Sequence, residues 1–176
     1  MSLLLLGPQG KMGEAVIMRL VGQGDDVRVV ELDREVAERW RTLGARVAQG
    51  AVDDPDLIER AAQNCRTIVV FEVDGDRGGL AALEAAVAAA RSTSVDRVVV
   101  TGTAAGSDCR RVLGCSGLAY VWLTMERGRG LRRRETPAVA IAEAIDAADD
   151  LAGNPKLELD LSNPRAWIEL GLEPRR

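Results

Sequence analysis

The 176-residue chain has no histidine, and its aromatic residues number only three Trp, one Tyr and one Phe. Without histidine, Ser-His-Asp and Cys-His catalysis is excluded, as is every metal site that depends on imidazole. The three cysteines, Cys65, Cys109 and Cys115, form no CxxC pair, which argues against a disulfide framework or a thiolate metal site. We therefore expect no bound metal, and a reducing compartment.

The chain also lacks a long apolar run and an excess of charge. Its first apolar run ends at Gly7 and Pro8, far short of the about 20 residues of a membrane span. With 23 basic and 27 acidic residues the net charge is -4, which disfavours nucleic acid as a partner. We expect a cytoplasmic protein with no membrane contact, and the length suits a single domain over residues 1–176.

Short apolar or β-branched runs alternate with amphipathic segments along the whole chain. The runs predict strands at 3–6, 27–32, 46–49, 67–71, 97–101, 120–123 and 156–161, and helices at 12–21, 34–42, 56–63, 80–91, 108–115 and 137–148. This alternation predicts an α/β fold, three-layered and Rossmann-like, with a parallel sheet of about six to seven strands. Alanines in segment 80–91 favour close helix packing, with a homodimer face as the alternative.

A glycine-rich loop lies between the first expected strand and the first expected helix. Gly7 allows a tight turn, Gly10 lets the backbone approach a phosphate, and Gly13 lets the helix pack close to the strand. A dinucleotide's pyrophosphate would meet backbone N–H groups and the positive helix end there. The cofactor-binding residues predicted from this loop are Gly7, Gln9, Gly10, Lys11, Met12 and Gly13. The alternative is a tight turn without a ligand.

An acidic residue, Asp33, follows the second expected strand. A carboxylate there accepts hydrogen bonds from the adenosine ribose and repels the extra phosphate of NADP, so NAD is the preferred cofactor. Arg34 keeps NADP open, because a guanidinium can hold a 2′-phosphate. In the alternative interpretation Asp33 is only a helix N-cap.

Beyond the glycine loop, three further stretches carry a family resemblance: 43–55, 95–100 and 116–123. With the Gly7-x-x-Gly10-x-x-Gly13 spacing, they resemble atypical short-chain dehydrogenases/reductases of the NmrA-like NAD(P)-binding kind. The resemblance implies a bound dinucleotide, with Val52 against the adenine ring and Phe71 completing the cofactor-binding set.

The chain departs from this family in the segment that supplies a proton. The family carries a Tyr-x-x-x-Lys pair there, whereas Thr103 to Cys115 contains neither residue. Thr103 is left as a weak catalytic candidate. Ala51 stands where the family has an aspartate for the adenine amino group, and Thr124 and Met125 replace an Arg-Pro pair.

These features imply an NAD(P)(H)-binding oxidoreductase that passes hydride to a small-molecule acceptor, such as a flavin, a quinone or a conjugated system. The alternatives are a non-catalytic NAD(H) sensor and a cyclase or isomerase on the same scaffold. Residues 44–62 also resemble the nucleotide-binding regulatory domains of potassium transport proteins. The basic stretch Arg127–Arg134 is either an anion clamp or a solvated loop, and the acidic stretch 72–76 either acid/base groups or a solvated loop.

Overall fold

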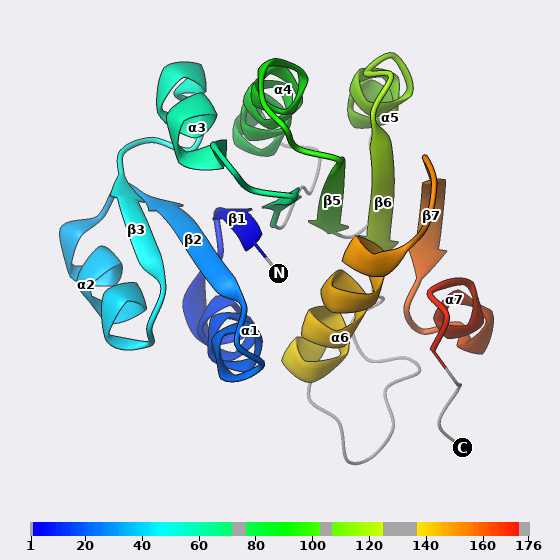
Figure 1. Cartoon of the computed structure of the whole chain (residues 1–176), viewed down its shortest axis with the longest axis horizontal. Helices are drawn as coiled ribbons and strands as arrows, with labels where there is room; N and C mark the ends of the chain where they lie inside the picture. The colour runs from blue at the N-terminus through cyan, green and yellow to red at the C-terminus, as the bar shows by residue number, and fades with distance from the viewer. Residues whose placement is uncertain (1, 72–76, 103–106, 125–136, 173–176) are drawn as a thin grey trace.

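In the computed structural model, which describes residues 2–71, 77–102, 107–124 and 137–172, seven parallel strands form one sheet (Figure 1). The strands are β1 (Ser2–Leu6), β2 (Asp26–Glu31), β3 (Arg46–Gln49), β4 (Thr67–Val70), β5 (Arg97–Gly102), β6 (Ala119–Thr124) and β7 (Lys156–Asp160). Their order is β3-β2-β1-β4-β5-β6-β7. The predicted three-layer Rossmann-like fold is confirmed.

In the described part of the chain, seven helices connect and cover these strands. They are α1 (Gly10–Gly22), α2 (Arg34–Thr42), α3 (Pro55–Ala62), α4 (Arg77–Ser92), α5 (Ser107–Gly114), α6 (Pro137–Asp150) and α7 (Pro164–Glu169). The bounds of α2 and β3 are those predicted. Helix α7 was not predicted, although Asn163 and Pro164 open it with the same cap-and-proline signal that Asp54 and Pro55 give α3.

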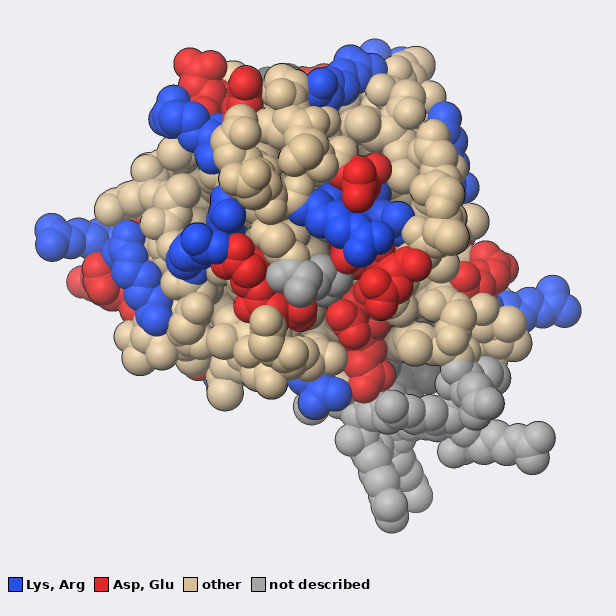
Figure 2. All heavy atoms as spheres, in the orientation of Figure 1, with Lys and Arg blue, Asp and Glu red and all other residues tan. Residues whose placement is uncertain are grey.

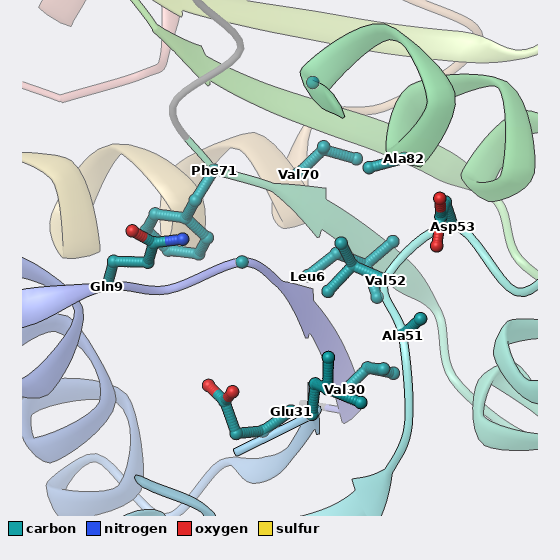
Figure 3. Close-up of a pocket in the computed structure, with 13 residues that line it drawn as sticks. Leu6, Gln9, Val30, Glu31, Ala51, Val52, Asp53, Val70, Phe71 and Ala82 are labelled. Carbon is teal, nitrogen blue, oxygen red and sulfur yellow. The ribbon is translucent and has the colours of Figure 1, made fainter. Parts of the chain in front are cut away.

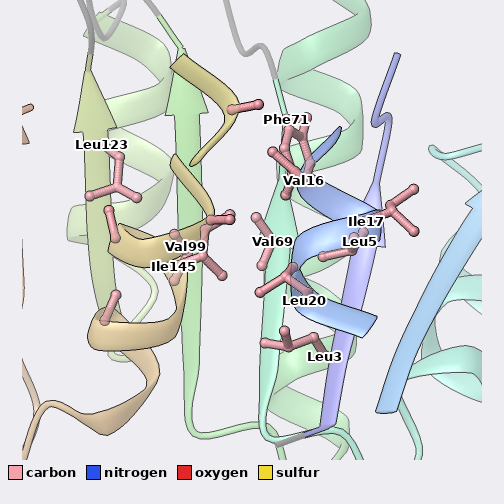
Figure 4. Packing of buried hydrophobic residues seen from close by; sticks show 14 of the residues in the cluster. Leu3, Leu5, Val16, Ile17, Leu20, Val69, Phe71, Val99, Leu123 and Ile145 are labelled. Carbon is pink, nitrogen blue, oxygen red and sulfur yellow. The ribbon is translucent and has the colours of Figure 1, made fainter. Parts of the chain in front are cut away.

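Two apolar layers hold the helices to the sheet. Leu3 and Leu5 belong to the layer on the side of α1 and α6, which also contains Ile17 and Ile145 (Figure 4). Leu4 and Leu6 belong to the opposite layer, beneath α3, α4 and α5. All four leucines are fully buried, which explains why β1 is a continuous apolar run rather than an alternating one.

The alanines of α4 pack inside the chain. Ala82, Ala85, Ala86, Ala89 and Ala90 are each at most 7% exposed, and α4 lies against α3 and α5. This burial favours the packing interpretation of the alanines. It leaves the homodimer face without an exposed alanine stripe.

The edge of the sheet where the strands begin carries structural polar contacts. The buried Asp149 carboxylate accepts a hydrogen bond from the Thr67 hydroxyl, and Arg97 donates to the carbonyl oxygens of Ala148 and Leu151. Acidic side chains gather along α6 on this face of the molecule (Figure 2). Burial and the charges of nearby aspartates raise the pKa of Asp146 in this helix.

The strand order reverses between β1 and β4, which are neighbours in the sheet. Strands β2 and β3 lie on one side of β1, and β4 to β7 lie on the other. In parallel α/β sheets, ligands bind beyond the carboxyl ends of the strands at such a reversal. The glycine loop after β1 lies at this point.

Candidate functional site

A cavity of about 510 Å³ opens at the carboxyl ends of β1, β2 and β4 (Figure 3). The loop that follows β3 and the start of α4 complete its walls. Its volume lies within the range of small-molecule sites. The fold therefore places a cavity at the position that the strand order marks for a ligand.

The glycine loop between β1 and α1 has a geometry that needs glycine at each predicted position. Gly7 and Gly10 have φ of +70° and +57°, in the left-handed region where other residues are strained. At Gly13, a Cβ atom would lie 2.6 Å from the carbonyl carbon of Pro8. The close approach of α1 to the loop therefore depends on Gly13.

The N-terminus of α1 differs from those of α2, α3 and α7. Asp33, Asp54 and Asn163 cap those three helices with side-chain oxygens. Gln9 at the N-cap of α1 makes no side-chain cap hydrogen bond. Because the first N–H groups of a helix have no intrahelical acceptor, α1 keeps donors available for an anion.

Space for such an anion is present beside Gly10. A Cβ atom built there would meet no heavy atom within 4 Å. The space next to the Gly10 backbone on that side is therefore open. Gly7 and Gln9 both line the cavity. The loop thus fits the phosphate-binding role predicted for it, by backbone shape and by donor supply.

Of the predicted cofactor-binding set, the cavity brings together Gly7, Gln9, Val52 and Phe71. Gly10, Lys11, Met12 and Gly13 form the first turn of α1 beside it. Asp33 and Arg34 do not line it.

Asp33 instead caps α2. Its Oδ1 accepts hydrogen bonds from the backbone N–H groups of Glu35 at 2.7 Å and Val36 at 3.1 Å. This is the alternative that the sequence left open for Asp33.

Glu31, the last residue of β2, lines the cavity, as does Asp53, and the sequence analysis did not name Glu31 as a site residue. Oε1 accepts a hydrogen bond from the Asp33 N–H at 3.0 Å, and Oε2 accepts one from Nε1 of Trp40 at 3.3 Å. Both oxygens are therefore held by fixed donors. Its position at the end of the apolar strand was the signal that could have identified it.

One wall of the cavity is apolar. Leu6, Val30, Val52 and Val70 line it, with Asp53 at the rim (Figure 3). Such a lining suits a flat ring bound by packing, with few polar groups to fix its orientation.

No tyrosine–lysine pair lies at this cavity. Tyr120, the only tyrosine, is paired in register with Lys156 near the starts of β6 and β7. This is the edge of the sheet opposite to the cavity. Thr103, the weak catalytic candidate, lies outside the described residues, as do Met125 and the stretches 72–76 and 127–134.

The described residues lack the features of two other classes of protein. Within those ranges, no group of three or more His, Cys, Asp or Glu side chains is arranged to hold a metal ion. None of the helices that the structure describes is long and apolar enough to cross a membrane. The three cysteines, which all lie within the described residues, form no disulfide; Cys65 and Cys109 are buried and Cys115 is exposed.

The fold and the glycine loop together define a nucleotide-binding protein with a Rossmann-like sheet. A family model described as NAD(P)H-binding matches residues 7–114, more than half of the chain, and the chain belongs to this family. The family resemblance drawn from the sequence is thereby confirmed. No curated protein matches the chain in sequence.

Solved structures with the same fold are similar to most of the chain. An anaerobillin reductase from Escherichia coli O157:H7 superposes with a TM-score of 0.72 at 14% identity, over 91% of this chain and 96% of the other. The NADPH complex of a quinone oxidoreductase from Escherichia coli gives 0.70 at 13% identity, over 97% and 76%. The NADP(H) complex of a triphenylmethane reductase from Citrobacter sp. gives 0.65 at 14% identity, over 90% and 69%.

Proposed function

We propose that this protein binds NAD(H) in the cavity beyond β1, β2 and β4 and transfers hydride to a small conjugated acceptor. The observation that carries the binding half is the N-terminus of α1. Its cap makes no side-chain hydrogen bond, and Gly10 has open space before it. A pyrophosphate there accepts hydrogen bonds from the backbone N–H groups of the first turn.

Glu31 is the residue we assign to the adenosine ribose. The sequence pattern predicts Asp33 for this role, but Asp33 caps α2 whereas Glu31 lines the cavity. Its carboxylate accepts hydrogen bonds from ribose hydroxyl groups and repels a 2′-phosphate. We therefore propose NAD(H) as the preferred cofactor, with NADP(H) bound more weakly.

Two observations support hydride transfer to a conjugated acceptor: the reductases among the similar structures, and the lack of a Tyr-Lys proton donor at the cavity. When bound, the nicotinamide ring supplies hydride. Three similar structures are those of an anaerobillin reductase, a quinone oxidoreductase and a triphenylmethane reductase. Tyr120 and Lys156 lie at the opposite edge of the sheet. An acceptor that takes hydride into a conjugated system suits a site without a Tyr-Lys pair.

The cytoplasm is the location we propose, because the three cysteines of the described residues form no disulfide and a reducing compartment keeps thiols in that state.

Binding is tested by titration calorimetry with NADH on the wild type, Gly10→Ala and Gly22→Ala. The first variant places a methyl group in the open space beside a left-handed backbone. We expect affinity to fall at least about tenfold. Gly22 is also helical, has no heavy atom within 4 Å of its Cβ position and lies at the far end of α1, so Gly22→Ala should bind as the wild type does.

Hydride transfer is tested separately, by following NADH oxidation with a panel of quinones and flavins. Steady oxidation that Gly10→Ala lowers and Gly22→Ala preserves would support the reductase. Saturable binding with no oxidation by any acceptor would contradict hydride transfer and favour the sensor.

A further inference from the structure

Helix α2 lies at the edge of the sheet and is held there by few buried side chains. It packs against β2 and against the edge strand β3. Of its nine residues, only Ala37 and Trp40 are buried, and most of the others are exposed. A helix of this length is marginal by itself in water, so its stability comes from tertiary contacts. Elements of this kind open locally at a low cost in free energy.

One side chain of the cavity, Glu31, is tied to both ends of this helix. Its Oε1 accepts a hydrogen bond from the backbone N–H of Asp33, the residue that caps α2. Its Oε2 accepts one from the indole N–H of Trp40, in the last turn of α2. Glu31 also lines the cavity, and its carboxylate extends toward the side where Gln9 lies (Figure 3). The same carboxylate therefore faces both the cavity and α2.

The Glu31 carboxylate can accept further hydrogen bonds. An ionised carboxylate has about four lone-pair sites, of which the N–H groups of Asp33 and Trp40 use two. Ribose hydroxyl groups that donate to the remaining sites do not displace these donors. They restrict the rotation of the Glu31 side chain and hold it in the orientation that faces Trp40. A bound ribose and a docked α2 therefore favour the same orientation of one side chain.

We propose that α2 responds to occupation of the cavity, because a ribose bound to Glu31 stabilises α2 against local opening through the Trp40 indole. This inference rests on the proposed function, since it takes the ribose of NAD(H) as the ligand of Glu31. Such coupling is reciprocal, so docked α2 raises the affinity for NADH by the factor by which NADH stabilises α2. We expect a factor of about five. The cofactor thereby controls the order of an exposed, charged helix.

Native-state hydrogen exchange of the wild type measures this response. NADH also stabilises the fold as a whole, so a second helix is needed as an internal reference. Helix α7 provides it, because its Trp167 indole donates to the carbonyl oxygen of Leu161 at 3.1 Å, next to β7 at the opposite edge of the sheet. At saturating NADH, amides of residues 38–42 should gain about fivefold more protection than those of residues 168–172. Equal gains in the two helices would overturn the inference.

Two matched variants assign the response to the Trp40 hydrogen bond. Trp40→Phe keeps a buried ring and removes the donor to Glu31, so the extra protection of residues 38–42 should disappear. Trp167→Phe removes the comparable donor of α7 and should leave that extra protection unchanged. Extra protection that persists in Trp40→Phe would overturn the inference. The wild-type comparison needs neither variant to fold.

Titration calorimetry with NADH on the same samples separates this inference from the proposed function. Saturable binding of NADH without extra protection of α2 would overturn the inference and leave dinucleotide binding intact. If the wild type binds no NADH, the proposed function is contradicted and this inference falls with it.

Discussion

The indole N–H of Trp40 donates a hydrogen bond to Oε2 of Glu31 across 3.3 Å. Trp40 lies on α2 and is only 1% exposed, whereas Glu31 lines the cavity. The buried indole therefore has its hydrogen bond satisfied by a residue of the candidate site. Together with the Asp33 N–H, it fixes both oxygens of the carboxylate.

Replacing Trp40 with Phe keeps a buried ring and removes this donor. The Glu31 carboxylate then keeps only the hydrogen bond from the Asp33 N–H, and its orientation is less restricted. We expect NADH affinity to fall about fivefold, the effect of one modest hydrogen bond, with NADPH affinity unchanged. Calorimetry with both dinucleotides measures this ratio, and equal weakening of both would show that Trp40 acts only through packing.

Two variants distinguish the proposed role of Glu31 in binding the ribose from the role of Asp33 in capping α2. Glu31→Gln should weaken NADH about tenfold and bring NADPH close to it, because the repulsion of the 2′-phosphate is lost. Asp33→Ala should instead lower the free energy of unfolding by about 1 kcal/mol, since α2 loses its cap. Calorimetry and urea unfolding measure the two effects.

The opposite pattern would reassign the ribose to Asp33. That pattern is a tenfold loss of NADH affinity in Asp33→Ala with Glu31→Gln unaffected. Glu38→Gln serves as a control, because Glu38 is exposed on α2 and pairs with Arg41 rather than facing the cavity.

Gly13→Ala should destabilise the loop that holds α1 against β1. The added Cβ lies 2.6 Å from the carbonyl carbon of Pro8, so backbone must move. We expect a loss of about 1–3 kcal/mol in the free energy of unfolding. Urea unfolding measures it, with Gly22→Ala as the comparison that gains up to about 1 kcal/mol in helix propensity. Equal stability of the two variants would contradict the close approach.

Asp146→Asn should stabilise the protein at neutral pH. Burial and the charges of Asp25, Asp149 and Asp150 raise the pKa of Asp146, so its ionised form is disfavoured in the folded state. This cost is fully present above the raised pKa and disappears below the ordinary value of 3.8. The gain at pH 7 should be at most about 1 kcal/mol, because solvent screens the group.

Thermal unfolding of this variant at several pH values checks the sign. The difference from the wild type should shrink as the pH falls toward 3.8. Glu169→Gln is the control, because Glu169 is exposed on α7. A gain that is independent of pH would contradict the electrostatic explanation.

The sequence predicted the sheet and most helices because buried parallel strands and amphipathic helices leave strong periodic patterns. It predicted α3 from Asp54 and Pro55, whose capping role needs no tertiary contact. The short α7 was missed because six residues give no periodic apolar pattern.

The site was harder to predict than the fold. The glycine positions followed from the loop alone, since the left-handed backbone at Gly7 and Gly10 is a local property. The choice between Glu31 and Asp33 depends on where β2 ends and α2 is capped. Two acidic residues so close in sequence face different surroundings, and only the three-dimensional structure shows which one reaches the cavity.

The crystal structure of the protein with NADH tests the central claim most directly. We predict the pyrophosphate at the N-terminus of α1, within hydrogen-bond distance of the N–H groups of Gly10, Lys11 or Met12. The adenosine ribose should contact the Glu31 carboxylate. A cavity that remains empty at saturating NADH, or a dinucleotide bound away from α1, would contradict the account.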